Sequence, residues 1–271
     1  MRSALIAAIA IMSIPANTAA HELRIADWNI NKGRHPAEIA RALQRLSPNI
    51  CILQEVDRHA RRTGGKDIAS ELAASLGMKY VFGQEFQELG QSMNGERALE
   101  GQAILSSLPI LRSRVLKFQH QSNFWKPSPL LPNLPFMQRR LGGRIALIAE
   151  LDVGGKALVI YNLHLESRSL GHLQYQQLEE VLTDAKRYPA ETPIIIAGDF
   201  NTKYRPSLFV RRFKRDGFRN CLGKSQRRTH KLIGTLDWIF ANGKIDVKGG
   251  QVHQNIKGSG HYPLTANFAT E

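Results

Sequence analysis

The hydrophobic pattern of this chain is most distinct at residues 194–196, where three isoleucines follow a proline and are soon ended by Gly198. A short, fully apolar run bounded by turn residues predicts a strand that is buried on both faces. Asp199 and Asn201 follow directly. Such strands deliver side chains into a cleft from their carboxyl ends. Gly-Asp-x-Asn also forms turns readily, so this stretch alone allows either interpretation.

Alternating and continuous apolar segments predict many further strands. We expect strands at residues 21–30, 49–56, 80–82, 103–105, 144–151, 156–165, 194–199, 235–241, 245–252 and 263–268. In the second of these, alternation places Cys51, Leu53 and Glu55 on one face. Helical spacing predicts helices at 36–46, 66–77 and 172–187, the second closed by Gly77, and we expect residues 211–228 to be irregular. Strands outnumber helices, which indicates an α/β (α+β) fold with two stacked sheets and helices outside.

The first 20 residues have the composition of a secretory signal peptide. They contain one arginine, an apolar segment at residues 4–14 and a small-residue exit at residues 19–20. The apolar segment is shorter than the ~20 residues that a membrane span needs. We therefore expect cleavage after Ala20 and a soluble mature protein that is secreted or periplasmic. Without repeats or Gly/Ser linkers, residues 21–271 are interpreted as a single domain.

Charge and cysteine content narrow the function further. Removal of residues 1–20 leaves 36 Lys and Arg against 23 Asp and Glu, a net charge of +13. Such an excess draws a protein to polyanions such as nucleic acid, acidic lipid headgroups or phosphorylated sugars. Cys51 and Cys221 are the only cysteines. A disulfide is possible in an oxidising compartment, but Cys51 lies in an apolar run, which favours a free, packed thiol.

Residues 118–142 do not fit the pattern of strands and helices. The segment contains four prolines together with nine large apolar residues, among them Phe124 and Trp125. Prolines exclude a helix or a sheet interior, and the apolar content argues against disorder. A loop of this length is usually functional or disordered. Packing over the body as a lid and presentation of an apolar patch therefore both remain open.

Polar residues end or punctuate several of the predicted strands. They are Asn29, Glu55, Asn162, His164, Asp199, Asn201, Asp237 and His261. Because an unpaired buried polar group costs ~1–3 kcal/mol, these side chains can satisfy one another only by converging, most economically around a cation. Oxygen ligands without cysteine favour Mg²⁺, Mn²⁺ or Ca²⁺. Glu55 with Asn29 would form the primary site, Asp199 would orient or deprotonate water, and His261 backed by Asp237 would act on a phosphoryl oxygen.

In their order along the chain, the motifs "DWNINKG", "LQEVD", "GQAILSS", "NLHLES", "GDFN", "TLDWIF" and "SGHYPL" resemble those of the endonuclease/exonuclease/phosphatase superfamily. This superfamily includes pancreatic-type DNases, abasic-site endonucleases, inositol-polyphosphate phosphatases and neutral sphingomyelinases. The resemblance spans the expected mature chain. It implies a four-layer α/β/β/α sandwich, with two stacked mixed sheets flanked by helices, and a phosphoesterase that depends on Mg²⁺ (or Mn²⁺).

The resemblance also assigns roles to individual residues. Asn29 and Glu55 fall on the family's metal positions, and His164 on a histidine with acid or phosphate-binding function. Asp199 and Asn201 match the pair that orients water and binds phosphate, and Asp237 and His261 match the final dyad. We assign Asn162 and Arg144 to substrate phosphate binding. Gly260 stands where the family usually has an aspartate that helps to hold the metal or its waters.

Three functions follow as hypotheses. The first is a secreted or periplasmic nuclease, favoured by the charge and by the basic stretch 211–228. The second is a sphingomyelinase-like phosphodiesterase acting on anionic or choline-type phospholipid, favoured by the apolar loop flanked by Lys126, Arg139 and Arg140. The third is a catalytically weakened protein that binds polyanions, motivated by Gly260. We expect a monomer and no protein partner.

Overall fold

The structure is a computed structural model that describes residues 21–122, 124 and 140–270. The expected signal peptide at residues 1–20 therefore lies outside the described residues, as does most of the proline-rich loop. Among the described residues, no helix combines the length and the apolar character that a bilayer crossing needs.

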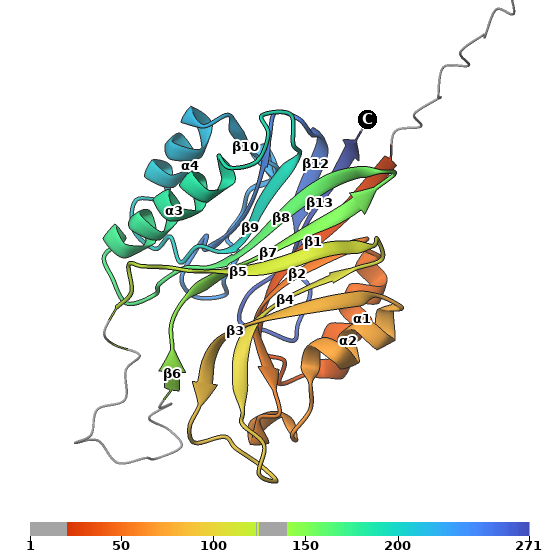
Figure 1. Ribbon diagram of the computed structural model, residues 1–271, viewed down its shortest axis with the longest axis vertical. Helices are drawn as coiled ribbons and strands as arrows, with labels where there is room; N and C mark the ends of the chain where they lie inside the picture. Colours follow the sequence, from red (N-terminus) through yellow and green to blue (C-terminus); the bar gives the residue numbers. More distant parts are fainter. Residues whose placement is uncertain (1–20, 123, 125–139, 271) are drawn as a thin grey trace, which may run out of the picture.

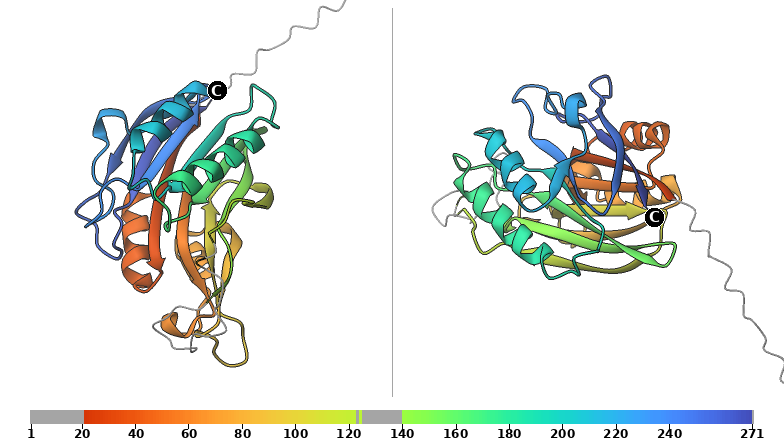
Figure 2. Two further views of the ribbon diagram at one scale, coloured as in Figure 1. Left: turned by 90° about the vertical axis from the view of Figure 1, so that its left-hand side faces the viewer. Right: turned by 90° about the horizontal axis from the view of Figure 1, so that it is seen from above.

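Two mixed sheets stack face to face to form the centre of the molecule (Figures 1 and 2). In spatial order, the first sheet contains β12 (Asp246–Val252), β13 (Leu264–Thr270), β1 (His21–Lys32), β2 (Ile50–Arg58), β4 (Leu99–Ser106), β3 (Lys79–Glu88) and β6 (Arg140–Gly142). The second contains β10 (Phe218–Asn220), β11 (Asp237–Asn242), β9 (Ile194–Asp199), β8 (Lys156–His164), β7 (Ile145–Val153) and β5 (Ile110–Lys117). Each sheet has one parallel pair, β1 with β2 and β8 with β9, among antiparallel neighbours.

Helices cover the outer face of each sheet. The first sheet packs against α1 (Pro36–Leu46) and α2 (Ile68–Leu76), and the second against α3 (His172–Ala185) and α4 (Pro206–Arg215). The turns η1 (Arg61–Thr63) and η4 (Gly223–Ser225) are 3₁₀ helices. Asp67 caps α2 by accepting from the Ser70 N–H at 3.0 Å, and Gly77 ends it with φ of 66°. The four-layer α/β/β/α sandwich expected from the sequence is confirmed.

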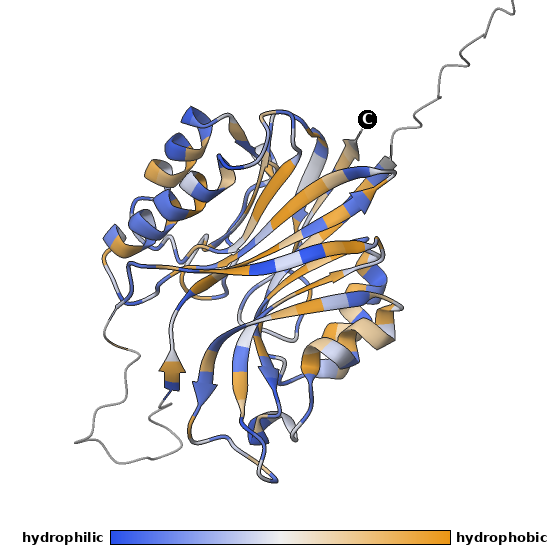
Figure 3. Cartoon of the chain, in the orientation of Figure 1, coloured by the Kyte–Doolittle hydropathy of each residue, from blue (hydrophilic) through white to orange (hydrophobic). Residues whose placement is uncertain are grey.

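The hydrophobic cores alternate along each strand, as the pleat requires. In β9, Ile195 points into the interior between the sheets, whereas Ile194 and Ile196 pack beneath α3 and α4. The isoleucine run is therefore buried on both faces, as expected. Figure 3 shows long apolar stretches along the central strands and a mixture of polar and apolar residues along the helices. The protein thus has three apolar layers, one between the sheets and one beneath each pair of helices. Their packing fixes the position of one sheet on the other, and with it the position of the strand ends.

Three elements differ from the sequence-based expectation. The stretch 211–228, expected to be irregular, begins inside α4 and also contains β10. In α4, Phe209 and Phe213 are one turn apart and buried, while basic residues occupy the exposed positions and obscure the apolar spacing. Strand β5 was missed because it is a sheet edge whose side chains are largely exposed, so it shows no buried alternation.

Both cysteines are free and buried. Cys51 packs among the apolar residues beneath α1 and α2, and Cys221 lies in the layer between the sheets. Burial raises the pKa of each thiol to about 12. The expectation of packed, unpaired thiols is thus confirmed.

Candidate active site

Three of the expected site residues form a row across the second sheet. In the parallel pairing of β8 with β9, His164 lies beside Asp199, and in the antiparallel pairing of β9 with β11, Asp237 lies on the other side of Asp199. On its own strand, each of the three occupies a position that points between the sheets, as Ile195 does on β9. Their side chains therefore face the first sheet. Strand register therefore brings these three side chains side by side at one edge of the sheet.

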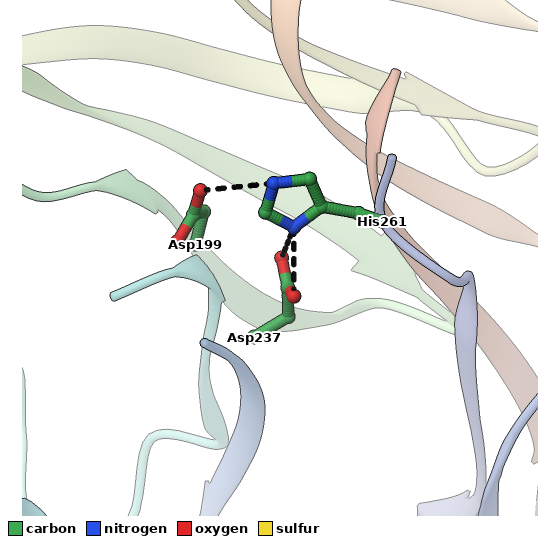
Figure 4. A group of neighbouring side chains, drawn as sticks. All are labelled: Asp199, Asp237 and His261. Carbon is green, nitrogen blue, oxygen red and sulfur yellow. Dashed lines mark hydrogen bonds and ion pairs between the residues drawn. The ribbon is translucent and has the colours of Figure 1, made fainter. Parts of the chain in front are cut away.

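The first sheet and its last loop supply the opposing residues. The amide of Asn29, near the end of β1, donates to Asp199 Oδ2 at 3.1 Å. His261 lies in the loop before β13, where its backbone carbonyl accepts from the Trp28 indole at 2.9 Å. Its Nε2 is 3.7 Å from Asp199 Oδ2, and its Nδ1 is 2.9 and 3.0 Å from the two oxygens of Asp237 (Figure 4). The cluster therefore bridges the two sheets.

Glu55 reaches this cluster by a route that alternation did not predict. Cys51 and Leu53 face the helices, as alternation requires. At Glu55, however, the backbone takes φ of 51° and the register of β2 shifts against both neighbouring strands. This bulge redirects the side chain, and Glu55 Oε1 lies 4.0 Å from His164 Nε2. The expectation that Glu55 shares a face with Cys51 and Leu53 was wrong, since a bulge resets the alternation.

His164 is oriented by a buried ion pair. Arg144 donates to Glu85 Oε2 at 2.7 Å and to His164 Nδ1 at 2.8 Å. A guanidinium cannot accept a hydrogen bond, so Nδ1 is the acceptor in this contact, and Glu85 Oε1 lies 3.3 Å from the same nitrogen. The other ring nitrogen, Nε2, lies 4.0 Å from Glu55 Oε1 and 3.8 Å from Asp199 Oδ2. The structure therefore places Arg144 behind His164, where it orients the ring.

The two amides expected at the site occupy different positions. Asn201, with φ of 51°, donates its backbone N–H to Asp199 Oδ1 at 2.9 Å and its side-chain amide to the Leu165 carbonyl at 3.0 Å. It thereby holds the Asp199 carboxylate in place. The Asn162 amide donates to the Leu53 and Ala103 carbonyls, and its oxygen accepts from Gln54 at 2.9 Å. Asn162 thus links the two sheets beneath the cluster.

Gly198 is required by the close pairing of β8 and β9. It has φ of 138°, and a Cβ at this position would lie 2.0 Å from the Leu163 carbonyl oxygen. Only glycine adopts this backbone without strain and allows this approach. The Gly-Asp step therefore sets the direction in which Asp199 leaves the strand.

The surroundings of Asp237 and His261 shift the pKa of both side chains. Burial opposes the charged imidazole, but the carboxylates of Asp237 and Asp199 raise the pKa of His261 to about 9. Burial raises the pKa of Asp237, and the attraction of His261 opposes that rise. His261 is therefore protonated at neutral pH and acts as a hydrogen-bond donor rather than as a base.

Glu55 belongs to a buried network of charged residues that was not predicted from the sequence. Burial raises the pKa of Glu55, but the ammonium of Lys32 and the charge of His164 hold it well below its usual range. Lys32 Nζ also lies 3.9 Å from Glu100, which pairs with Arg140 at 3.2 Å. These residues lie on β1, β4 and β6. Lysine, glutamate and arginine are usually found at the protein surface. Their burial could be inferred only from the fold.

The donor chemistry of the cluster fits a hard divalent cation. Glu55 and Asn29 provide carboxylate and amide oxygens, and Asp199 and Asp237 add two carboxylates that lie, with His261, within 4.8 Å of one another. The protonated His261 is a donor beside these oxygens and not itself a ligand. Oxygen donors with at most an imidazole are typical of Mg²⁺ and Mn²⁺ sites. Lys32 already neutralises part of the charge of Glu55, so a cation would share this carboxylate with the ammonium.

The family model described as the endonuclease/exonuclease/phosphatase family matches residues 28–259. The chain belongs to this family. The match contains all of the expected site residues except His261, which lies two residues beyond it. Endonuclease/exonuclease/phosphatase family members are hydrolases of phosphoesters, which agrees with the chemistry of the cluster. No curated protein matches the sequence.

Solved structures confirm the fold of this endonuclease/exonuclease/phosphatase domain. A family member from Beutenbergia cavernae aligns over 92% of this chain and 72% of its own, with a TM-score of 0.68 and 20% identity. The human Nocturnin catalytic domain with bound sulfate anion aligns over 91% and 94%, with a TM-score of 0.68 and 18% identity. TDP2 from C. elegans aligns over 91% and 75%, with a TM-score of 0.60 and 17% identity.

Proposed function

We propose that the protein is an exported, Mg²⁺- or Mn²⁺-dependent phosphodiesterase whose substrate is nucleic acid. The observation that carries the proposal is the convergence of Asp199, His261 and Glu55 from both sheets at one cluster. Residues 1–20 would direct export. Family membership supports phosphoester hydrolysis in general, and the surface around the cluster supports the choice of substrate.

The residues of the cluster divide the reaction between them. In hydrolysis, a water oxygen attacks phosphorus, the bond to the leaving oxygen breaks, and the water proton passes to the Asp199 carboxylate. Asn29 and Asn201 hold that carboxylate through hydrogen bonds of 3.1 and 2.9 Å. Protonated His261 donates from Nε2 to a phosphoryl oxygen, and Asp237 fixes the ring. A divalent cation held by Asn29 and Glu55 would supply charge neutralisation for the phosphoryl oxygens.

The surface beside the cluster carries cations and aromatic side chains. A hollow of about 980 Å³ lies between the starts of α3 and α4, and Tyr175, Tyr204 and Phe209 line it together with Lys203 and Arg205. Lys203 follows Asn201 by two residues, so this hollow adjoins the catalytic strand end. Aromatic rings that stack on bases, with cations for the backbone, are typical of nucleic-acid grooves.

The test compares plasmid nicking with and without Mg²⁺ and chelator. We expect metal-dependent nicking that Asp199→Ala abolishes, and weaker Mg²⁺ binding by calorimetry in Glu55→Gln. For the substrate, Lys203→Ala with Arg205→Ala should lower DNA affinity and flatten its salt dependence. Lys244→Ala serves as the matched exposed-lysine control. Absence of nicking by folded wild-type protein would contradict the nuclease assignment and favour a binding-only role.

A second candidate, a phospholipid phosphodiesterase, is favoured by exposed apolar side chains. Leu170 and Leu232 are 77% and 87% exposed, Ile233 is 48% exposed, and Phe124 is 57% exposed beneath the guanidinium of Arg168. Large exposed apolar groups with basic neighbours are typical of membrane-interface surfaces. Release of headgroups from mixed phospholipid vesicles, without nicking of DNA, would select this candidate. Vesicle binding that Leu232→Ser removes and Leu111→Ser retains would support it.

A further inference from the structure

His230 lies against the catalytic dyad but belongs to none of the family motifs. It sits in the loop before β11 and forms an isolated β-bridge with His261. Its ring meets the His261 ring edge-on, with centroids 4.6 Å apart. On either side of this bridge, the Lys231 N–H donates to the Gly260 carbonyl at 2.9 Å and the Tyr262 N–H donates to the Thr229 carbonyl at 2.7 Å. The backbone therefore fixes where the His230 ring lies.

The hydrogen bonds of His230 determine which ring nitrogen carries the proton. Its Nδ1 accepts from the backbone N–H groups of Leu232 and Ile233, at 3.0 and 3.1 Å. A nitrogen that accepts two such bonds is unprotonated, so the proton of the neutral ring is on Nε2. This excludes Nε2 as a metal ligand, because its lone pair is taken by the proton. Nε2 can therefore act only as a hydrogen-bond donor.

Gly260 leaves the space in front of this donor open. A Cβ built on Gly260 would lie 3.4 Å from His230 Nε2, so any side chain here would project toward the imidazole. The backbone of Gly260 lies outside the left-handed range, so glycine is not needed for conformation. What glycine provides is room beside the ring. The positive charges of His261, Lys203 and Arg228 act on His230, and the carboxylate of Asp199 opposes them.

We propose that His230 Nε2–H and the open space at Gly260 form a subsite for a non-bridging phosphoryl oxygen of the substrate. The subsite rests on the proposed phosphodiesterase function and extends it. His261 donates to the phosphoryl group from one side, and His230 adds a second, neutral donor next to it. The missing side chain at position 260 is the feature that admits the oxygen beside Nε2.

The experiment uses a variant that keeps the loop intact. In His230→Asn, the side-chain oxygen replaces Nδ1 as the acceptor for the Leu232 and Ile233 N–H groups, but no donor remains at the position of Nε2. His230→Gln places an amide N–H close to that position instead. His253→Gln is the matched control, since this half-buried histidine lies in a different loop, between β12 and β13, and bonds Thr265 at 2.8 Å.

Two quantities are measured on the full chain: the Kd of inorganic phosphate by calorimetry with chelator present, and kcat/KM for bis(p-nitrophenyl) phosphate with Mg²⁺. We expect His230→Asn to weaken phosphate binding roughly ten- to a hundredfold, the range for a bond to a charged group. His230→Gln should recover much of the loss, and His253→Gln should match the wild type. Gly260→Ala, which fills the space, should weaken phosphate binding without moving His230.

The outcomes separate the two proposals. Unchanged phosphate binding in His230→Asn, or equal losses in the Asn and Gln variants, would overturn the subsite while leaving diester hydrolysis intact. If the wild type binds phosphate with the expected dependence on His230 but cleaves no diester, the subsite stands and the proposed phosphodiesterase function fails.

Discussion

Replacement of Asp237 by Asn should lower the pKa of His261 and so remove the stability that its bound proton gives to the folded protein. Asp237 is fully buried, and both of its oxygens contact His261 Nδ1 at about 3 Å. The amide keeps the shape of the carboxylate but not its charge, so the pKa of His261, about 9 in the wild type, should fall. The measurement that checks this directly is the titration of the His261 ring by NMR.

The magnitude follows from the difference between the folded and unfolded pKa of His261. The folded pKa of about 9 lies above the ordinary value of 6.5. The stability from this proton is therefore fully present below pH 6.5 and is lost as the pH rises through 9. The difference corresponds to about 3 kcal/mol. Because Asp199 also holds the proton, Asp237→Asn should remove roughly 2–3 kcal/mol of this pH dependence.

Urea unfolding at pH 6 and pH 9.5 measures the effect. Wild type should lose roughly 2–3 kcal/mol more stability between these pH values than Asp237→Asn does. Titrating groups away from the dyad are common to both proteins and cancel in the comparison, so the difference reports on His261 together with Asp237 and its neighbour Asp27. Asp246→Asn, which neutralises an exposed carboxylate paired with Lys248, should behave like wild type. Equal losses in wild type and Asp237→Asn would refute the assignment of His261 as a protonated, Asp237-bound imidazole.

Three further outcomes are expected from the structure. Glu85→Gln, which removes the carboxylate from the buried ion pair with Arg144, should cost about 3 kcal/mol or more in urea unfolding, and a loss below about 1 kcal/mol would contradict it. Gly198→Ala should lower stability by about 4 kcal/mol or more, since its Cβ would meet backbone oxygen at 2.0 Å, whereas Gly243→Ala, with no atom near its Cβ, should melt like wild type. Both thiols, buried and with pKa raised to about 12, should react with Ellman's reagent only in denaturant, and prompt reaction of native protein would argue against their burial.

The sequence predicted the fold where local pattern and burial agree. The isoleucine run of β9 is buried on both faces, and the polar residues that follow it could be predicted to face the opposing sheet, since strand parity carries from Ile195 to Asp199. Helix α4 was missed because only two phenylalanines per three turns mark its buried face. A narrow apolar stripe under a basic surface is a weak signal in sequence.

The site was predicted less completely, for reasons that depend on backbone geometry. The position of Glu55 depends on a bulge with φ of 51°, which sequence alternation cannot reveal. Arg144 could be identified as a polar residue at a strand start, but its position behind His164 depends on the register between the sheets. Lys32 and Glu100 resemble surface residues and become a buried pair only when β1 and β4 enter the same sheet.

The division of the cluster between the sheets has a consequence for folding. Asn29, Glu55 and His261 come from one half of the sandwich, and His164, Asp199 and Asp237 from the other. Neither half alone contains a working set of groups. The cluster therefore exists only when the two sheets are docked on each other. Mild denaturant or pressure that separates these halves should extinguish turnover while most backbone hydrogen bonds within each sheet persist.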